Sequence, residues 1–262
     1  MLGALASKWN TYLSNHRDNQ LLARLDPATF LALEPDLQIA HLSPGDVITS
    51  ANASVEKVYF PHGGLISCFV KFDNGEIVET GMIGRDGQCG AGATIECQIP
   101  CNYAVAELAG TASVVDAARF RKLASSVPQL RHETMAYEFF LLAQAQQTAA
   151  CNAAHNVSER VCKWLLRMQA LVGNEISVTQ LSLAQMIGVR RSTVAGVAVD
   201  LRDAGMISYT RGRLKIEDLA QMQAAACVCG KRLNAQYSRA FPPNVGCISN
   251  DAQHSVRERE KL

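Results

Sequence analysis

The chain has 262 residues, with 25 Lys and Arg against 24 Asp and Glu, a formal net charge of +1 and 48% hydrophobic residues. No apolar run approaches the ~18 residues that a membrane helix needs, and the N-terminus lacks the basic and then apolar segments of a secretory signal. The nine cysteines are odd in number and scattered, which is typical of thiols in a reducing compartment. These features predict a cytoplasmic globular protein with no membrane contact.

Charge is unevenly distributed along the chain. Residues 1–127 carry 9 Lys and Arg against 13 Asp and Glu, whereas residues 156–216 carry 9 against 4. A basic half joined to an acidic half indicates that the C-terminal half meets a polyanion. The alternative is that both halves are simply solvated faces.

The N-terminal part of the sequence predicts a short helical lead-in followed by strands. Residues 21–36 have a helical pattern, and residues 41–116 alternate β-rich runs with the turn signals SPGD, PHGG, FDNGE and GRDGQCGAG. Asn74-Gly75 lies between two such runs and predicts a hairpin in which both turn residues need positive φ. Strands spaced at roughly ten residues with no helices between them predict an antiparallel barrel or jelly roll.

A long helix is predicted over residues 130–156, which contain no Gly or Pro. Apolar residues at a spacing of three and four continue along it for several turns. One stripe consists of Met135, Phe139, Leu142 and Gln146, and a second stripe beside it contains Leu130, Tyr137, Leu141, Ala145 and Thr148. The helix either packs on its own domain or pairs with a second copy, and the wide stripe of small residues favours pairing through the first stripe.

A second helix is predicted over residues 156–173, ending at Gly173. Its apolar face and its polar face are both clear in the sequence. The apolar face consists of Val161, Trp164, Leu165, Met168 and Leu171, and the polar face of Glu159, Arg160, Lys163 and Arg167. We expect the polar face to point away from the core.

The stretch LAQMIGVRRSTVAGVAVDLRDAGMI, residues 183–207, predicts two short helices joined by a turn. Thr179 can cap the first helix, and Gly188 can end it with a sharp turn. The run VAGVAV has β propensity, but as a strand it would bury alternate residues, and these form a poor apolar face. A helix starting near Arg190 instead buries one stripe at helical spacing, made of Val194, Val197, Ala198 and Leu201. Helix, turn and helix form the helix-turn-helix pattern.

The second of these helices leaves a distinctive set of residues off its buried stripe. Arginine can bind guanine O6 and N7 bidentately in a major groove, and hydroxyls at a helix N-terminus suit phosphate oxygens. GMISYTRGRLKI, residues 205–216, then predicts a basic hairpin, or wing, that contacts flanking phosphates. The residues predicted to contact DNA are Thr179, Arg190, Arg191, Ser192, Thr193, Ala195, Gly196, Val199, Arg202, Arg211, Arg213 and Lys215.

These stretches resemble the Crp/Fnr family of bacterial transcription regulators, over about residues 20–225. The most specific pieces are HNVSERVCKWLLRM and LSLAQMIGVRRSTVAGVAVDLRDAGMISYTRGRLKI. The resemblance implies an α+β chain with a cyclic-nucleotide-binding-like β-roll, a dimerisation helix and a winged helix-turn-helix. The implied boundaries are 1–20 for the lead-in, 21–127 for the roll, 128–155 for the dimerisation helix, 156–225 for the DNA-binding domain, and 226–262 for a helix end and a flexible tail.

The resemblance also implies roles and departures in the helix that reads DNA. Arg191 aligns with the arginine that usually reads a base in the family, and Thr193 with a phosphate-contacting residue. The family's glutamate after that arginine is replaced by Ser192, and its later arginine by Gly196. We therefore expect this chain to read an operator of its own.

The effector pocket departs further from the family pattern. Cyclic-nucleotide binders carry a Gly-Glu pair and a downstream Arg-Ser, and the nearest stretches here are Gly87-Gln88 and Cys101-Asn102, with Gly75 as a further pocket candidate. Without the arginine, a buried phosphate would lack a cation, which costs several kcal/mol. Cyclic AMP is therefore not expected to be the effector.

The cysteines and histidines can be metal ligands or ordinary packed residues. The first cysteine is Cys68, so the N-terminal cysteine cluster of the iron–sulfur members is missing. Cys97-x3-Cys101 and Cys227-x-Cys229 can bind metal or form a redox switch, but packed thiols are favoured. His62, His132 and His155 are interpreted as local hydrogen-bonding residues. No metal and no cofactor is expected.

The leading hypothesis is a homodimeric regulator that binds a pseudo-palindrome in double-stranded DNA, with RNA polymerase and a small-molecule effector as further partners. A second hypothesis is a ligand- or redox-sensing module whose winged helix contacts protein rather than DNA. An enzyme is not expected, because the sequence has no nucleophile–base motif, phosphate loop or HExxH.

Overall fold

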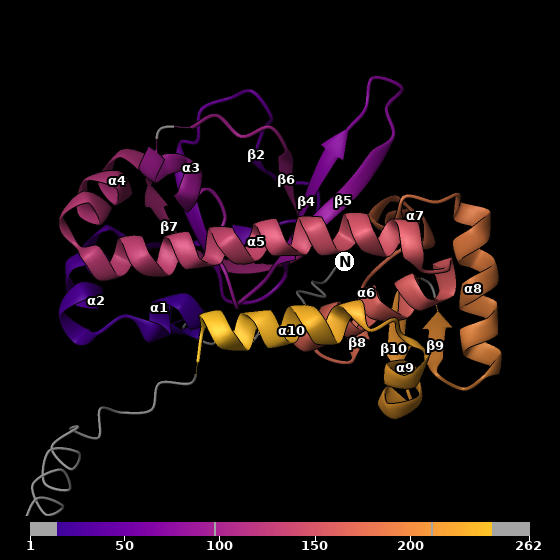
Figure 1. Cartoon of the computed structure of the whole chain (residues 1–262). Helices are drawn as coiled ribbons and strands as arrows, with labels where there is room; N and C mark the ends of the chain where they lie inside the picture. Colours follow the sequence, from indigo (N-terminus) through magenta and orange to yellow (C-terminus); the bar gives the residue numbers. More distant parts are fainter. Residues whose placement is uncertain (1–14, 97, 211, 243–262) are drawn as a thin grey trace, which may run out of the picture.

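The computed structural model describes residues 15–96, 98–210 and 212–242. Figure 1 shows a β-roll at one side, a long helix α5 that crosses the molecule, and a winged helical domain at the far end of α5. Helix α10 runs back beneath α5 towards the N-terminal helices. Within the described part of the chain, no helix is both long and apolar enough to cross a membrane.

The N-terminal lead-in consists of short helices that pack against the roll. These are η1 (His16–Asp18), α1 (Gln20–Arg24), α2 (Pro27–Leu33) and η2 (Glu34–Asp36). Asn19 caps α1 with its side-chain oxygen and donates its amide to the carbonyls of Pro61 and Gly87, at 2.9 and 2.8 Å. A buried asparagine with all these partners fixes the lead-in onto the roll.

The roll is built from two antiparallel sheets, as the turn spacing predicted. One sheet has the order β1-β7-β3 and the other the order β2-β6-β4-β5. The strands are β1 (Gln38–Leu42), β2 (Val47–Thr49), β3 (Lys57–Pro61), β4 (Leu65–Lys71), β5 (Ile77–Ile83), β6 (Tyr103–Leu108) and β7 (Gly110–Asp116). The expected antiparallel fold of this region is confirmed.

The hairpin predicted at Asn74-Gly75 joins β4 to β5, but its turn differs from the prediction. Phe72 pairs through its N–H with the carbonyl of Glu76, and Gly75 donates to the carbonyl of Phe72. Only Gly75 has positive φ, at 84°, and Asn74 does not. The connection is therefore a longer loop with one left-handed residue, because Asn74 uses its side chain to accept from the Glu76 N–H.

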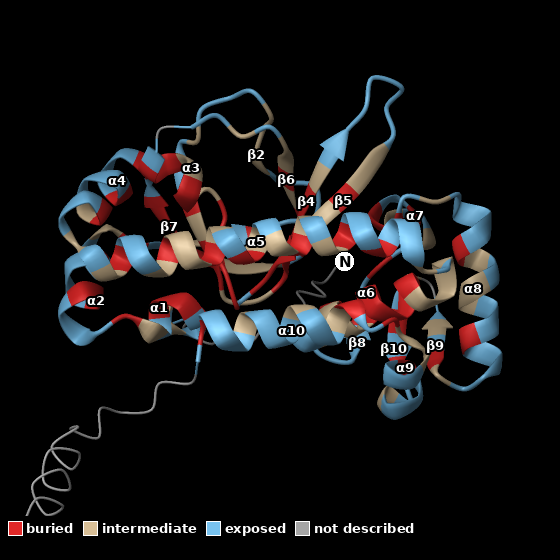
Figure 2. Ribbon diagram, in the orientation of Figure 1, coloured by how far each residue is buried: buried red, intermediate tan, exposed pale blue. Residues whose placement is uncertain are grey.

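The expectation of strands with no helix between them is wrong at one place, because α3 (Ala91–Glu96) lies between β5 and β6. Helix α4 (Ala117–Ser126) follows β7 and leads into the 27-residue α5 (Pro128–Ala154). One face of α5 is buried against its own roll, through residues that include Leu130, Tyr137, Phe140 and Thr148. Figure 2 shows buried and exposed bands alternating along α5, so the helix both covers its own core and presents a second face.

The C-terminal domain contains α6 (Val157–Val172), β8 (Glu175–Ile176), α7 (Gln180–Ile187), α8 (Arg191–Asp203), β9 (Ile207–Thr210), β10 (Arg213–Ile216) and α9 (Leu219–Ala225). The strands form one sheet in the order β8-β10-β9. Its core is continuous with Leu65, Met82 and Leu108 of the roll. Burial of this shared apolar surface holds the domain against the roll.

The polar face of α6 is not solvated, contrary to expectation. Arg160 is 7% exposed and Lys163 is 4% exposed, and Arg167 forms an ion pair of 2.7 Å with Asp86 of the roll. The reason is tertiary: the roll, α7 and α10 pack around a helix whose sequence shows only one apolar face. The Lys163 ammonium also lies 4.2 Å from the centre of the Trp164 ring.

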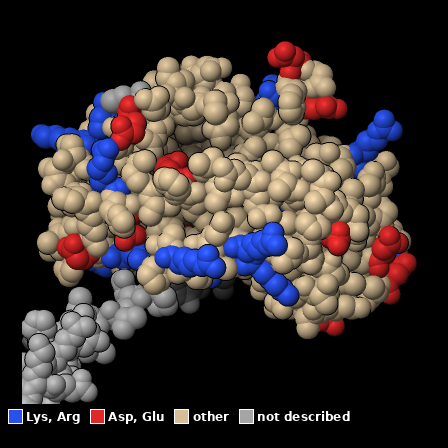
Figure 3. Space-filling model, viewed as in Figure 1, with Lys and Arg blue, Asp and Glu red and all other residues tan. Residues whose placement is uncertain are grey.

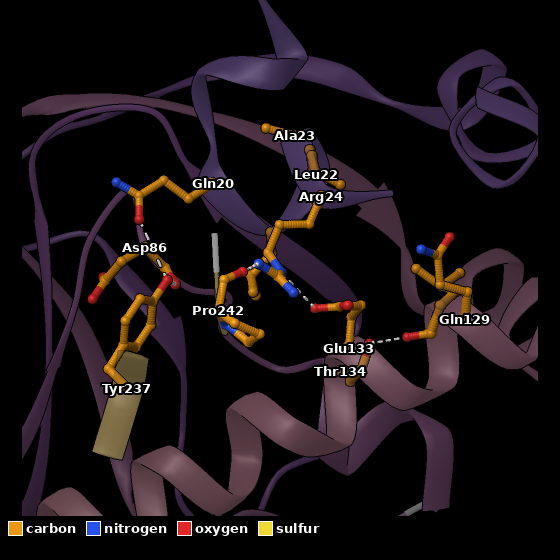
Figure 4. Close-up of polar contacts among 12 residues, drawn as sticks. Gln20, Leu22, Ala23, Arg24, Asp86, Gln129, Glu133, Thr134, Tyr237 and Pro242 are labelled. Atoms are coloured by element: carbon orange, nitrogen blue, oxygen red, sulfur yellow. Dashed lines mark hydrogen bonds and ion pairs between the residues drawn. The ribbon is translucent and has the colours of Figure 1, made fainter. Parts of the chain in front are cut away.

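Helix α10 (Cys229–Ala240) is a full helix where only a helix end was expected in residues 226–262. Tyr237 donates to the carbonyl of Asp86 at 2.9 Å and to Gln20 at 3.3 Å, while Arg24 binds Glu133 and the carbonyl of Pro242 (Figure 4). These contacts hold α10 against the roll and the lead-in. Residues 243–262, which make up most of the predicted flexible tail, lie outside the described residues.

Candidate nucleic-acid interface

The helix-turn-helix is fixed by the caps that the sequence predicted. Thr179 accepts a hydrogen bond from the Ser182 N–H at 3.0 Å and so caps α7. Gly188 ends α7 in the left-handed conformation, with φ 69° and ψ 45°. Because an L side chain rarely adopts this conformation, glycine suits the tight turn into α8.

The predicted helical register of α8 is confirmed. Val194 and Leu201 are buried, and Val197 and Ala198 are half-buried on the same side. The opposite side faces solvent and carries Arg191, Ser192, Thr193, Gly196 and Val199, with Ala195 half-buried at its edge. The β-prone run VAGVAV is thus the middle of a helix, because the helical spacing of its larger side chains outweighs its propensity.

The start of α8 is cationic and has free donors. Arg190 is the N-terminal flanking residue, and no side chain caps the first turn. Neither Arg190 nor Arg191 pairs with a carboxylate within the described ranges. Figure 3 shows basic side chains projecting where α8 begins. An uncapped helix N-terminus flanked by two free arginines is suited to bind phosphate.

The wing forms as predicted, but not all of its cations are free. Thr210 pairs with Arg213 across the turn, where Gly212 has φ 79°. Arg213 is exposed, whereas Lys215 binds Glu217 at 2.8 Å. That contact raises the pKa of Lys215 through its hydrogen bond to Glu217. Arg211 lies outside the described residues.

Arg202, near the other end of α8, points to a partner within its own helix. Its guanidinium binds the carboxylate of the adjacent Asp203 at 2.8 Å. Among the predicted cations that are described, those without a carboxylate partner are therefore Arg190, Arg191 and Arg213. The first two lie together at the start of α8.

Two contacts that the sequence did not indicate hold the motif in place. Arg160 of α6 donates to the carbonyl of Ile187, the last residue of α7. Tyr209 of β9 donates to the carbonyl of Val178, just before α7, at 2.8 Å. A cation at a helix C-terminus offsets the partial negative charge of its carbonyls. Arg160 was missed because its place in the pattern indicated a solvated face.

The candidate effector residues are spread over several environments. Gly75 lies in the exposed turn of the β4–β5 hairpin, and Cys101 is exposed before β6 with Asn102 half-buried beside it. Gly87 and Gln88 are buried beneath α5, where a Cβ on Gly87 would overlap the ring of Tyr137. Gly87 therefore permits the close approach of the roll to α5.

Gln88 is occupied by contacts within the protein. Its amide nitrogen donates to the Glu138 carboxylate at 2.7 Å, and its oxygen accepts from the Ala91 N–H at 2.8 Å. Glu138 also accepts from the Gly92 N–H, in the first turn of α3, at 3.2 Å. Burial raises the pKa of Glu138, and the hydrogen bonds from Gln88 and Gly92 oppose that shift.

A cavity of about 280 Å³ lies between α5, α6 and α10. Its lining includes Phe140, Trp164, Lys163 and Cys227. This cavity was not predictable from sequence patterns, because one of its walls belongs to α10. A wider recess, between the roll and the end of α6, is lined by His62, Arg85 and Gly173 among others.

The three histidines interpreted above as hydrogen-bonding residues, His62, His132 and His155, lie in different environments. His62 contacts Ser113 through Nε2 at 2.7 Å and Thr111 through Nδ1 at 3.3 Å, so its predicted local hydrogen bonding is confirmed. Burial lowers the pKa of His62. His132 is exposed on α5. His155 ends α5, and its Nδ1 lies 3.6 Å from the sulfur of Cys229.

The predicted pairing stripe of α5 lies on its uncovered face. Phe139 is 74% exposed and Leu142 is 52% exposed. Met135 is half-buried and Gln146 is exposed on the same side. Two large apolar side chains, Phe139 and Leu142, are therefore exposed about one turn apart on this face of α5.

The comparisons with known proteins agree with this architecture. Residues 159–225 match the Crp-like helix-turn-helix domain. No curated protein matches the chain. A transcriptional regulator of the Crp/Fnr family from Eubacterium rectale superposes with a TM-score of 0.63 at 16% identity, covering 80% of this chain and 98% of that one.

Two further solved structures have a similar fold. FixK2 from Bradyrhizobium japonicum has a TM-score of 0.63 at 15% identity, covering 73% of this chain and 98% of that one. The c-di-GMP responsive global regulator CLP from Xanthomonas campestris has a TM-score of 0.61 at 14% identity, covering 74% and 100%. The predicted resemblance is confirmed: the chain has the fold of the Crp/Fnr transcription regulators and carries their Crp-like helix-turn-helix domain.

Proposed function

We propose that the protein is a transcription regulator that binds a pseudo-palindromic operator as a homodimer through α8 and the wing. The observation that carries this proposal is the start of α8. There, among the described residues, Arg190 and Arg191 have no carboxylate partner, the Arg190 side chain does not cap the first turn, and the following surface residues are small. Such an end can enter a major groove, bind phosphate and bring an arginine to a base edge.

Within this proposal, Arg191 reads a base and Arg190, Ser192 and Thr193 bind phosphate. Gly196 offers no Cβ, and nothing lies within 4 Å of where one would be. The helix can therefore lie close to the bases, with Val199 available to a thymine methyl. Arg213 contacts the flanking backbone, together with the expected contribution of Arg211.

The homodimer forms through the exposed stripe of α5. In the described part of the chain Phe139 and Leu142 are 74% and 52% exposed, and a second copy of the same stripe would bury both. The stripe pairs with itself about a two-fold axis, as in most homodimers. Two copies of α8 would then reach half-sites about 34 Å apart along the DNA.

Cyclic AMP is not the effector in this proposal. The first turn of α3, which offers backbone N–H groups to an anion, already holds the carboxylate of Glu138. A phosphate placed there would meet a carboxylate and find no arginine at Cys101-Asn102. Isothermal titration calorimetry with cyclic AMP should show no binding at micromolar concentration. Micromolar binding would refute this part of the proposal.

Selection of bound sequences from random double-stranded DNA tests the main proposal. We expect enrichment of a palindrome with half-sites one helical turn apart, and a retarded band of a dimer on one site in gel shifts. Arg191→Ala should lose this preference. The matched control is Arg202→Ala, which should keep it, because Arg202 is an exposed arginine at the other end of α8 whose guanidinium binds Asp203 and which we no longer expect to contact DNA. Uniform affinity for all sequences, or no binding, would contradict the proposal.

A further inference from the structure

Four side chains of metal-binding type converge where α5 ends. Their ligand atoms, the sulfurs of Cys151, Cys227 and Cys229 and a ring nitrogen of His155, all lie within 4.8 Å of one another. The three cysteines are buried and form a cluster of their own, and His155 is half-buried beside them. Cys151 lies one helical turn before His155, the C-cap residue of α5, whereas Cys227 lies in the link between α9 and α10 and Cys229 is the first residue of α10.

Two of the separations between these atoms match those around one tetrahedral ion. The sulfurs of Cys151 and Cys227 are 3.6 Å apart, and the sulfur of Cys229 is 3.6 Å from His155 Nδ1. With Zn–S bonds of about 2.3 Å and Zn–N bonds of about 2.0 Å, a tetrahedron places two sulfurs about 3.8 Å apart and sulfur and nitrogen about 3.5 Å apart. An iron–sulfur cluster would need a wider cage, because several atoms separate its cysteine sulfurs.

We propose that Cys151, His155, Cys227 and Cys229 bind a single tetrahedral divalent cation of the zinc class. Three thiolates and one imidazole form a complete donor set for structural zinc, which leaves no position open for water or substrate. On binding, each of the three thiols releases its proton to solvent and donates through sulfur. This site replaces our expectation that Cys227-x-Cys229 is only packed into the core.

The surroundings of the four side chains support an anionic metal complex. A zinc ion with three thiolates and a neutral imidazole carries a net charge of −1. Gln147 donates its amide to the sulfur of Cys229 at 3.1 Å, as expected of an outer hydrogen bond to a metal-bound thiolate. Two buried cations, Arg160 and Lys163, interact electrostatically with these cysteines.

Arg160 gives a second, independent indication. One of its terminal nitrogens donates to Ile187, but its Nε is buried and has no hydrogen-bond partner. Lys163 forms no ion pair with a carboxylate in the described segments. Buried cations without carboxylate partners are costly, and an anionic metal–thiolate centre nearby would offset that cost.

The location of the site suggests what the ion does. Its ligands come from the end of the proposed pairing helix, from the junction of α5 and α6, and from the segment that follows the winged domain. A bound ion would tie these three segments together and so fix the winged domain relative to α5. This inference goes beyond the proposed regulator and does not depend on DNA binding.

The first test is a metal titration of the full chain, purified under reducing, anaerobic conditions and stripped with a chelator. Co²⁺ is the probe, because cobalt in a tetrahedral thiolate site absorbs strongly in the visible range. We expect the visible cobalt absorption to saturate at one Co²⁺ per chain, together with a thiolate charge-transfer band. Both the visible absorption and the charge-transfer band should disappear when Zn²⁺ is added. The absence of a tetrahedral spectrum in the reduced wild-type protein would overturn the proposal, whatever the variants do.

The second test locates the ion. Cys227→Ser and His155→Asn should each abolish the stoichiometric cobalt spectrum, whereas Cys101→Ser, in the exposed cysteine of the other pair, should leave it unchanged. Gln147→Ala keeps all four ligands and should weaken Zn²⁺ affinity by ~10–100-fold. Circular dichroism verifies that each variant is folded. An unchanged spectrum in Cys227→Ser would overturn the proposal, as would a wild-type chain whose only reaction is a disulfide between Cys151 and Cys227 in mass spectrometry.

Discussion

The cations of α6 and those at the start of α8 look alike in the sequence and differ completely in the structure. Arg160 and Lys163 are buried under other elements, and Arg167 pairs with Asp86. Arg190 and Arg191 are exposed and have no carboxylate partner among the described residues. One set of cations holds the domain to its neighbours, and the other is available to a ligand.

This difference shows that a local charge excess is a weak guide to a binding surface. Residues 156–216 contain 9 Lys and Arg, but Arg160, Lys163 and Arg167 account for part of that number and do not form an outward-facing basic surface. The polyanion-binding surface that we propose is therefore narrower than composition indicated, and it centres on the start of α8 and on the wing.

The largest expected effect is a loss of protein stability on substitution of a buried cation of α6. Arg167→Ala leaves Asp86 buried without its cation, since the two side chains are 18% and 7% exposed. Loss of one partner of a buried ion pair costs about 3–5 kcal/mol, so the free energy of unfolding should fall by that amount in urea denaturation. Arg202→Ala removes an exposed pair and should change it by less than about 0.5 kcal/mol. Equal effects of the two substitutions on stability would contradict the distinction between the buried cations of α6 and the exposed cations of α8.

The next effect is on DNA recognition by the exposed set. Arg191→Ala should lower the preference for the selected operator over a mutated one by about 1–3 kcal/mol, because a bidentate contact to a base is lost. The stability of the protein should stay unchanged, since Arg191 is exposed. Competition gel shifts measure the preference and urea denaturation measures stability. A large loss of stability would place Arg191 with the buried cations instead.

A smaller effect separates phosphate contacts from base contacts. Arg213→Ala in the wing should weaken binding to all sequences alike. The slope of log affinity against log salt should become less negative by about 1. Fluorescence anisotropy over a salt series measures this for the operator and for a scrambled sequence. A change confined to the operator would mean that the wing reads bases.

The smallest effect concerns the small residue that brings α8 close to DNA. Gly196→Ala fills open space, because nothing lies within 4 Å of the added carbon. Removing a helical glycine should raise the free energy of unfolding by about 0.5–1 kcal/mol, whereas operator affinity should fall. Thermal denaturation and gel shifts are measured on the same preparation. A gain in both quantities would indicate that α8 does not approach DNA at Gly196.

Local sequence patterns predicted much of the fold. The helical spacing of Val194 and Leu201 gave the register of α8, and the capping chemistry of Thr179 and Gly188 gave the turn before it. Asn74-Gly75 located a hairpin but suggested the wrong turn, because the conformation of Asn74 depends on a side-chain hydrogen bond to Glu76. Periodicity and capping therefore predicted helices and their ends, whereas a conformation set by one side-chain hydrogen bond did not follow from the residue pair alone.

The site was only partly predictable for the same reason. The exposed face of α8 followed from its periodicity, but the pairing of Arg202 and Lys215 with neighbouring carboxylates did not. Cys151 and His155 have the spacing of one helical turn, which is a usable signal. Their two partners lie more than 70 residues away in the sequence, so a spacing argument could not connect them.

The sequence by itself determined the order of the elements and the register of each amphipathic helix. It also determined which helix exposes arginines to solvent. These depend on periodicity, capping and backbone conformation, which act over a few residues. Only the tertiary structure decided which charges are buried, what α10 covers and which cysteines meet. Burial depends on elements that are distant in the chain, and a polar side chain remains in the interior only when another segment supplies its partner.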